Sequence, residues 1–292
     1  MKSAKQLLLA SRPFSWINTC LPFLALALDS SPRSLPAVIV GGVYFLFTYN
    51  LLLYGVNDLY DYESDRLNPR KGGVEGGLLP PQTAGRLWLV VALTNLPLLA
   101  LLAWLAGPVP LLAVVITAGV ALAYSMPPLR TKLIPGLDSI TSSLHFVLPC
   151  LCGGLIAGLS LPDLPWRILA AFFLWGMASQ ALGAIQDMEF DRQAGLSSVA
   201  TAMGAPRTAL FSALAYLAAA ILISVGGGLQ LFASIVLFPY IGLSLYALNS
   251  EITRARRAWR GFLVLNLLVG FILTQLLLYH WGLRLTRVLS WL

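Results

Sequence analysis

The chain has 292 residues, of which 58% are hydrophobic and only 11% are charged, and its mean hydropathy is +0.79. This composition excludes an ordinary soluble domain and indicates an integral membrane protein. The formal net charge of +7 does not require nucleic acid as a partner, because basic loops that contact anionic lipid account for it.

Nine apolar stretches of about the length that crosses a bilayer follow one another along the chain. In chain order they cover residues 14–28, 35–55, 87–106, 109–125, 139–160, 166–185, 208–226, 229–248 and 262–282. They predict an all-α membrane protein, a bundle of about nine transmembrane helices. Because we see no soluble appendage or linker between them, we expect residues 1–292 to form a single integral-membrane domain.

An acid-rich segment follows the second stretch. Asp58, Asp61 and Asp65 are spaced i, i+3 and i+7, which places them on one face of a helix. Three carboxylates on one stripe repel each other unless a divalent cation lies among them, and Asn57 adds an amide oxygen. A solvated helix end is the alternative, but it predicts mixed charges around the helix. We therefore predict that Asn57 and the three aspartates bind a metal ion.

A second acid-rich segment follows the sixth stretch, with Asp187 and Asp191 on one helix face and a turn at Gly195. Alone, this spacing is equally well explained by a surface helix, and Glu189 points elsewhere. However, the two segments together hold seven of the twelve carboxylates. Two carboxylate clusters that face one pocket suit a polyphosphate bound through Mg²⁺. The aspartates of both segments are thus the predicted catalytic metal ligands.

Basic residues lie close to the acid-rich segments. The Pro127-Pro128 pair stops a helix and presents Arg130 and Lys132 on the side of the acids, where they can bind phosphate oxygens. Ordinary positive charge at a cytoplasmic loop is the alternative explanation. Residues 68–73 add cations and a glycine pair just after the first segment, which suits a mobile lid over the pocket.

The basic residues also predict the orientation. With the N-terminus in the cytoplasm, fifteen Lys and Arg residues fall inside and four outside, as the positive-inside rule favours. We expect a prokaryotic-type inner (cytoplasmic) membrane, with the active site opening to the cytoplasm. No cleavable signal peptide is expected, because residues 1–12 have no cleavage site after a short apolar core.

An allylic diphosphate is the substrate that fits such a site. Mg²⁺ and basic residues stabilise the departing diphosphate, which leaves an allylic cation. That cation requires a dry, apolar cavity lined by aromatic rings. Aromatic residues flank the first acid-rich segment, although the sequence assigns none of them a role; they are Tyr44, Phe45, Phe47, Tyr49, Tyr54 and Tyr60.

The two acid-rich segments resemble the signatures N-D-x-x-D-x-x-x-D and D-x-x-x-D of the UbiA superfamily of intramembrane prenyltransferases. The resemblance covers nearly the whole chain and implies nine helices, two Mg²⁺ ions between the motifs and lateral entry of both lipid substrates. The segment from Tyr124 to Lys132 is similar to the Y-x-x-x-K segment of that family, although here the lysine lies eight residues beyond the tyrosine. The diphosphate-binding residues implied are Arg12, Asn57, Arg66, Lys71, Tyr124, Arg130 and Lys132.

Residues 11–19, 49–58, 61–65 and 68–76 show a narrower resemblance, to the lycopene elongases of C50 carotenoid pathways. Such enzymes add C5 units from dimethylallyl diphosphate to the ends of lycopene, and water or proton loss quenches the resulting tertiary cation. The resemblance thus implies three partners: an allylic diphosphate donor, a lipophilic acceptor such as lycopene, and membrane lipid.

Two other functions are compatible with parts of the pattern. The same donor chemistry on an aromatic acid or quinone precursor shares the metal ligands, with Arg12 as a cation for the acceptor's carboxylate. A membrane transporter places its acids on an ion path near the bilayer midplane. Here the acids lie at the ends of apolar stretches, and the sequence shows no inverted repeat, which disfavours transport. A non-catalytic scaffold has no use for two acid stripes.

Overall fold

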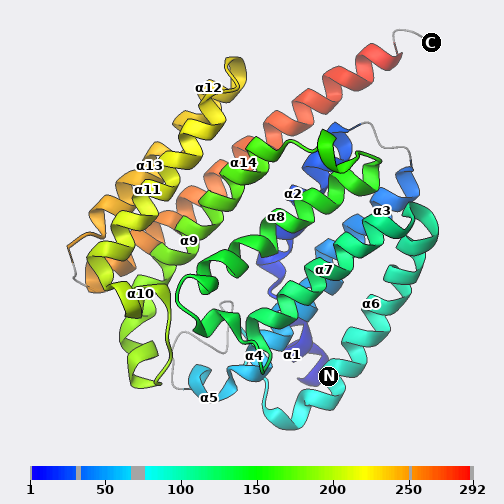
Figure 1. The fold of residues 1–292 in the computed structure, drawn as a ribbon. Helices are drawn as coiled ribbons and strands as arrows, with labels where there is room; N and C mark the ends of the chain where they lie inside the picture. Colours follow the sequence, from blue (N-terminus) through cyan, green and yellow to red (C-terminus); the bar gives the residue numbers. More distant parts are fainter. Residues whose placement is uncertain (1, 31–33, 67–75, 250–251, 290–292) are drawn as a thin grey trace. The chain divides into compact units, whose positions relative to one another are not determined.

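The computed structural model describes residues 2–30, 34–66, 76–249 and 252–289. These residues are mostly helical and contain no extended β-strand, which confirms the predicted all-α class (Figure 1). The helices are α1 Lys2–Ala10, α2 Trp16–Asp29, α3 Leu35–Val43, α4 Val56–Tyr60, α5 Tyr62–Asp65, α6 Ala84–Ala106, α7 Pro108–Ser125, α8 Leu137–Ala157, α9 Trp166–Gln193, α10 Val199–Met203, α11 Ala205–Ser224, α12 Gly228–Ile235, α13 Phe238–Tyr246 and α14 Ile252–Leu289.

Seven helical stretches among the described residues are long and apolar enough to cross a membrane. They are Leu35–Tyr60, Pro81–Ala106, Pro108–Ser125, Leu137–Ala157, Trp166–Gln193, Ala205–Ser224 and Ile252–Tyr279. The first predicted stretch corresponds to α2, which has 14 residues, and the eighth is divided between α12 and α13. A total of about nine crossings and a cytoplasmic N-terminus therefore stay predictions.

The chain divides into two compact units, each with its own hydrophobic core. Unit 1 comprises Met1–Leu164 with Phe190–Ser198, and unit 2 comprises Pro165–Glu189 with Val199–Leu292. Helix α9 begins in unit 2 and ends in unit 1. The single domain over residues 1–292 stays a prediction.

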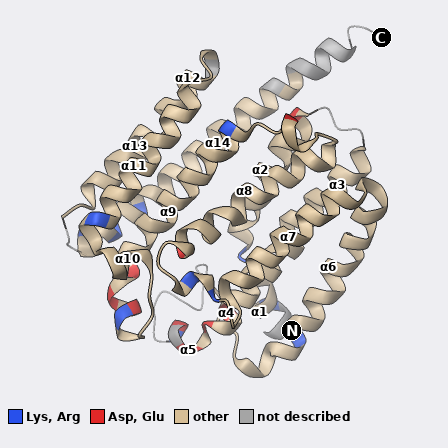
Figure 2. Cartoon of the chain, in the orientation of Figure 1, with Lys and Arg blue, Asp and Glu red and all other residues tan. Residues whose placement is uncertain are grey.

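In unit 1, α8 packs against both α2 and α7, and α6 packs against α3 and α7. The approach of α8 to α2 depends on Gly153, because a Cβ at this position would collide with the carbonyl oxygen of Phe23. Small residues allow such close backbone contact between membrane helices. The bodies of α3, α6 and α7 carry few charges, whereas charged residues gather around α4 and α5 (Figure 2). Unit 1 thus combines a tightly packed apolar body with a charged end.

The stretch Leu35–Tyr60, called the second span below, is not a regular α-helix. It contains two π-helical segments, Tyr44–Thr48 and Leu51–Gly55. The buried Asn50 side chain donates to the Phe45 carbonyl at 2.8 Å and to the Leu46 carbonyl at 3.1 Å. A side chain inserted into the backbone ladder distorts a helix, and π turns are frequent at functional sites. These π turns lead directly into α4.

In unit 2, α11 packs against α12 and α13, and α13 packs against α14. The rings of Tyr216 and Tyr240 lie 5.3 Å apart in its core, and the Tyr216 hydroxyl shares a 2.9 Å hydrogen bond with Ser179. The buried phenol of Tyr216 is therefore paired with a polar neighbour.

Candidate functional site

The first acid-rich segment lies where the second span ends, on α4 and α5. Its helical turns continue through Asp61, because the Asp61 N–H donates to the Asn57 carbonyl at 3.0 Å and the Asp65 N–H donates to the Asp61 carbonyl at 2.8 Å. Asp58 and Asp65 are buried, and the Asp61 side chain is 15% exposed. The three carboxylates thus lie on two successive short helices at the end of an apolar span, and two of them are buried.

The Asp58 side chain is fully buried, and both of its carboxylate oxygens accept a hydrogen bond. Arg12 Nη2 donates to Asp58 Oδ1 at 3.0 Å, and the Gly77 N–H donates to Asp58 Oδ2 at 2.6 Å. The Arg12 guanidinium also lies 4.5 Å from the centre of the Tyr54 ring, a cation–π contact. Sequence reasoning missed Gly77, because only the folded chain brings it beside Asp58.

Asp61 is contacted by the two cations that the loop after α7 was predicted to present. Lys132 Nζ donates to Asp61 Oδ1, and Arg130 Nη2 donates to the same oxygen at 3.3 Å. Lys132 Nζ also donates to Asn57 Oδ1 at 3.1 Å, and the Ser125 hydroxyl donates to that oxygen at 2.9 Å. Ser125, at the end of α7, was not predicted because no motif marks it.

Arg12 and Arg130 each have a strained backbone conformation. In the described part of the chain they are the two non-glycine residues with a positive φ, 50° for Arg12 and 36° for Arg130. Such conformations cost about 1–3 kcal/mol each and cluster at active sites and ligand clamps. Here both occur at residues whose guanidinium groups contact the motif, which supports a functional role for this cluster.

The cluster is largely shielded from water. Burial alone would lower the pKa of Arg12, but the charge of Asp58, with a smaller contribution from Asp65, raises it above the ordinary value. Burial lowers the pKa of Lys132, and the attraction of Asp61 offsets only part of this effect. Charges that are paired away from water interact strongly, so each cation depends on its carboxylate.

The other predicted residues lie in different surroundings. Arg66 is exposed and pairs with Glu63 at 3.0 Å. Tyr124 is half-buried, its ring centre 4.8 Å from that of His145. Lys71 lies outside the described residues, as does the proposed lid.

The second motif is split between the two units. Asp187 belongs to unit 2 and Asp191 to unit 1, where the Ser198 hydroxyl donates to Asp191 Oδ2 at 3.3 Å. Glu189 is exposed. That both motifs face one pocket therefore stays a prediction.

The donor atoms of the first motif suit Mg²⁺, which prefers carboxylate and amide oxygens. Among the described residues, no group of three or more His, Cys, Asp and Glu side chains is arranged to hold a metal ion. Instead, Asp58 and Asp61 each contact a basic side chain. A metal ion at Asn57, Asp58, Asp61 and Asp65 would have to replace these contacts, and the displaced cations would then require another anion.

Comparison with known proteins finds a matching family model and similar curated proteins. The model of the UbiA prenyltransferase family matches residues 17–270. A lycopene elongase/hydratase from Corynebacterium glutamicum is 41% identical over 282 residues, which are 95% of this chain and 98% of that protein. The C(50) beta-cyclic carotenoids biosynthesis protein LbtBC from Dietzia sp. is 42% identical over 275 residues; the match covers 92% of this chain but spans only 63% of LbtBC.

A solved structure shows the same fold. It is a UbiA homolog from Archaeoglobus fulgidus bound to DMAPP and Mg²⁺, with a TM-score of 0.65 and 23% sequence identity. The similarity covers 91% of this chain and 99% of that one.

We expect Arg12→Ala to lower the thermal unfolding temperature more than the double variant Arg12→Ala/Asp58→Asn does. Removing the cation alone leaves a buried carboxylate without the guanidinium that contacts it, which typically costs about 3–5 kcal/mol, whereas the double variant also removes the negative charge. Thermal unfolding of the purified protein in detergent measures this difference.

Glu63→Gln is the matched control. It breaks an exposed ion pair, which contributes about 0–1 kcal/mol. If the single and double variants lose equal stability, the pairing of Arg12 with Asp58 does not have the assigned energetic role.

Proposed function

The chain belongs to the UbiA prenyltransferase family, and from this premise we propose that it transfers a C5 prenyl group from dimethylallyl diphosphate to the ends of a lycopene-like polyene, in a Mg²⁺-dependent reaction. The observation that carries the proposal is the cluster in which Arg12, Arg130 and Lys132 contact Asp58 and Asp61 at the end of an apolar span. Membership of the family makes the chain an integral membrane prenyltransferase.

The cluster suits a diphosphate because its charges can exchange partners. A metal-bound diphosphate brings both the cations that carboxylates require and the anions that arginine and lysine require. Asn57, Asp58, Asp61 and Asp65 would hold one ion, and Asp187 with Asp191 would contribute to the second. Arg12, Arg130 and Lys132 would then bind the phosphate oxygens, and an arginine can donate to two oxygens at once. Bound Mg²⁺ neutralises charge on the departing diphosphate.

The residues next to the cluster suit the other half of the donor. Tyr54 lies beside Arg12, and the second span behind it is buried and rich in aromatic rings. Ring faces stabilise an allylic cation, and a dry environment protects it from premature capture by water. The C5 group is thus proposed to lie along the second span, with its diphosphate at α4.

The polyene acceptor is supported by the relatives. The relative from Corynebacterium glutamicum is named a lycopene elongase/hydratase, and the name of LbtBC refers to C(50) carotenoid biosynthesis. We place the site at the cytoplasmic face of a prokaryotic inner membrane, as the distribution of basic residues favours.

Co-expression of the chain with a lycopene-producing pathway tests this function. Products that carry one or two added C5 units support both the donor and the acceptor. Unchanged lycopene, in cells where the folded protein is present in the membrane, contradicts the acceptor. Assays with an aromatic acid or a quinone precursor then test the other acceptor class.

Asp58→Ala, Asp61→Ala and Asp187→Ala should each lower turnover by at least about 100-fold, because each removes a ligand of the ion that stabilises the leaving group. EDTA should abolish activity and Mg²⁺ should restore it. Diphosphate release by the purified enzyme is the measurement. Glu189→Ala, at an exposed position, is the control that should retain activity. Full activity in any of the three variants contradicts the assignment of that residue.

The activity should fall at high pH when Lys132 loses its proton. Because burial lowers the pKa of Lys132, this loss occurs at a lower pH than for an ordinary lysine. In Lys132→Arg the cation stays protonated, so the alkaline limb of the pH profile of kcat/KM should move to higher pH. The position of the limb is the readout, whatever the maximal rate. If the alkaline limb does not move, a group other than Lys132 causes it.

A further inference from the structure

Two buried tyrosines on the second span lack hydrogen-bond partners. Tyr44 and Tyr49 are 0% exposed, and within the described part of the chain nothing pairs with either hydroxyl oxygen. Buried polar groups are nearly always paired, because an unpaired one destabilises the fold. Phenylalanine would fill the same space without that cost. Packing alone therefore does not explain these hydroxyls.

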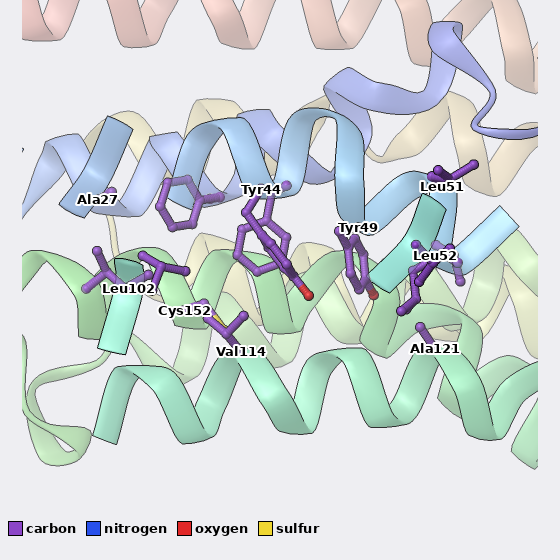
Figure 3. Close-up of a cluster of buried hydrophobic side chains, with 14 of the residues drawn as sticks. Ala27, Tyr44, Tyr49, Leu51, Leu52, Leu102, Val114, Ala121 and Cys152 are labelled. Atoms are coloured by element: carbon purple, nitrogen blue, oxygen red, sulfur yellow. The ribbon is translucent and has the colours of Figure 1, made fainter. Parts of the chain in front are cut away.

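The π turns place the tyrosines in a series. Tyr44, Tyr49 and Tyr54 are five residues apart, a spacing that does not share one face of an α-helix. A π turn is closed by an i→i+5 hydrogen bond, and the Tyr49 N–H does donate to the Tyr44 carbonyl. As a result, the ring centres of Tyr44 and Tyr49 lie 6.2 Å apart. Figure 3 shows both phenol oxygens directed toward α7.

The series starts at the proposed diphosphate site. Tyr54 is in contact with Arg12, which is paired with Asp58. Tyr49 lies between Tyr54 and Tyr44 on the second span, five residues from each. The tyrosines thus run from the charged end of unit 1 into its apolar core, along the path proposed for the C5 group.

The residues packed around the two tyrosines are mainly apolar. Tyr44 and Tyr49 belong to the buried cluster that includes Phe45, Val114 and Ala121 (Figure 3). The Phe45 ring packs edge-on against both, at 5.1 Å from Tyr44 and 5.3 Å from Tyr49. The rings provide faces for a cation, while the hydroxyls provide two polar partners, the minimum that holds a water molecule in an apolar site.

We propose that Tyr44 and Tyr49 bind the water molecule that ends the reaction by adding to the tertiary carbocation. The inference rests on the proposed function, in which this cation forms when the C5 unit joins the polyene. A lone pair of the water oxygen forms the new C–O bond, one O–H bond of the resulting oxonium breaks, and the released diphosphate accepts the proton. The product is a tertiary alcohol. Without that water, the cation loses a proton from a neighbouring carbon to the diphosphate and gives an alkene.

The test uses Tyr44→Phe, Tyr49→Phe and the double variant, each co-expressed with a lycopene-producing pathway. These substitutions keep the rings and remove only the hydroxyls. The ratio of hydroxylated to dehydrated C5-extended products, measured by mass, should fall at least about tenfold in the double variant. The ratio is taken within the C5-extended products, so a change in the rate of prenyl transfer does not alter it. Growth in heavy-oxygen water identifies the hydroxyl oxygen as water-derived.

Tyr216→Phe is the matched control, because it removes a buried phenol hydroxyl that is paired with Ser179. It should lower the thermal unfolding temperature and leave the product ratio unchanged. Tyr44→Phe and Tyr49→Phe should show the opposite, a changed ratio with no loss of thermal stability, because their hydroxyls have no protein partner.

The outcomes separate this inference from the function on which it rests. C5-extended products with an unchanged ratio in both single variants overturn the water site and leave the prenyl transfer intact. Exclusively dehydrated products from the unaltered chain likewise overturn the water site and leave the prenyl transfer intact. Absence of any C5-extended product from the unaltered chain overturns the proposed function and this inference with it.

Discussion

The pairing of Asp58 with Arg12 is the interaction on which the rest of the site depends. A carboxylate with no exposed surface, at the end of an apolar helix, is stable only if a cation and hydrogen-bond donors surround it. That requirement draws the turn before α2, with its left-handed Arg12, onto the end of the second span. It also draws in the backbone of Gly77. Three segments far apart in the sequence meet because one charge must be compensated.

The charge of Asp61, one helical turn later, is also compensated by cations. Asp61 is contacted by Arg130 and Lys132 from the loop between α7 and α8. The cations and carboxylates of the cluster therefore neutralise each other while the protein is alone. A ligand that carries both metal ions and phosphate offers new partners to every member at once. An ordinary anion satisfies only the cations and leaves the carboxylates unpaired, so the cluster is suited to a metal–diphosphate complex.

Much of the charged site could be predicted from the sequence, because charge in an apolar chain is conspicuous. The stripe of Asp58, Asp61 and Asp65 follows from helical spacing, and the approach of Arg130 and Lys132 follows from their place beside a helix-stopping proline pair. The roles of Ser125 and Gly77 could not be predicted, because their contacts depend on how distant segments pack. The π turns were also missed, since Asn50 reads in the sequence as one more residue of a long apolar helix.

The fold, too, could be predicted from the sequence only in part. The apolar stretches predict the long helices well. However, α2 is shorter than a bilayer crossing, and the eighth stretch is broken between α12 and α13. Hydropathy predicts which segments are buried in an apolar medium, but it does not predict where a helix ends or breaks. The free hydroxyls of Tyr44 and Tyr49 are likewise visible only in the structure, because in the sequence these residues resemble any other aromatic residue of a membrane helix.

Calorimetric titration of the purified protein with inorganic diphosphate, with and without Mg²⁺, tests the central claim most directly. If the cluster exchanges its internal ion pairs for a metal–diphosphate complex, diphosphate binds only when Mg²⁺ is present, and Asp61→Asn removes that binding. Equal binding without Mg²⁺, or undiminished binding to Asp61→Asn, would show that the basic residues alone hold the anion and would contradict the role assigned to the carboxylates.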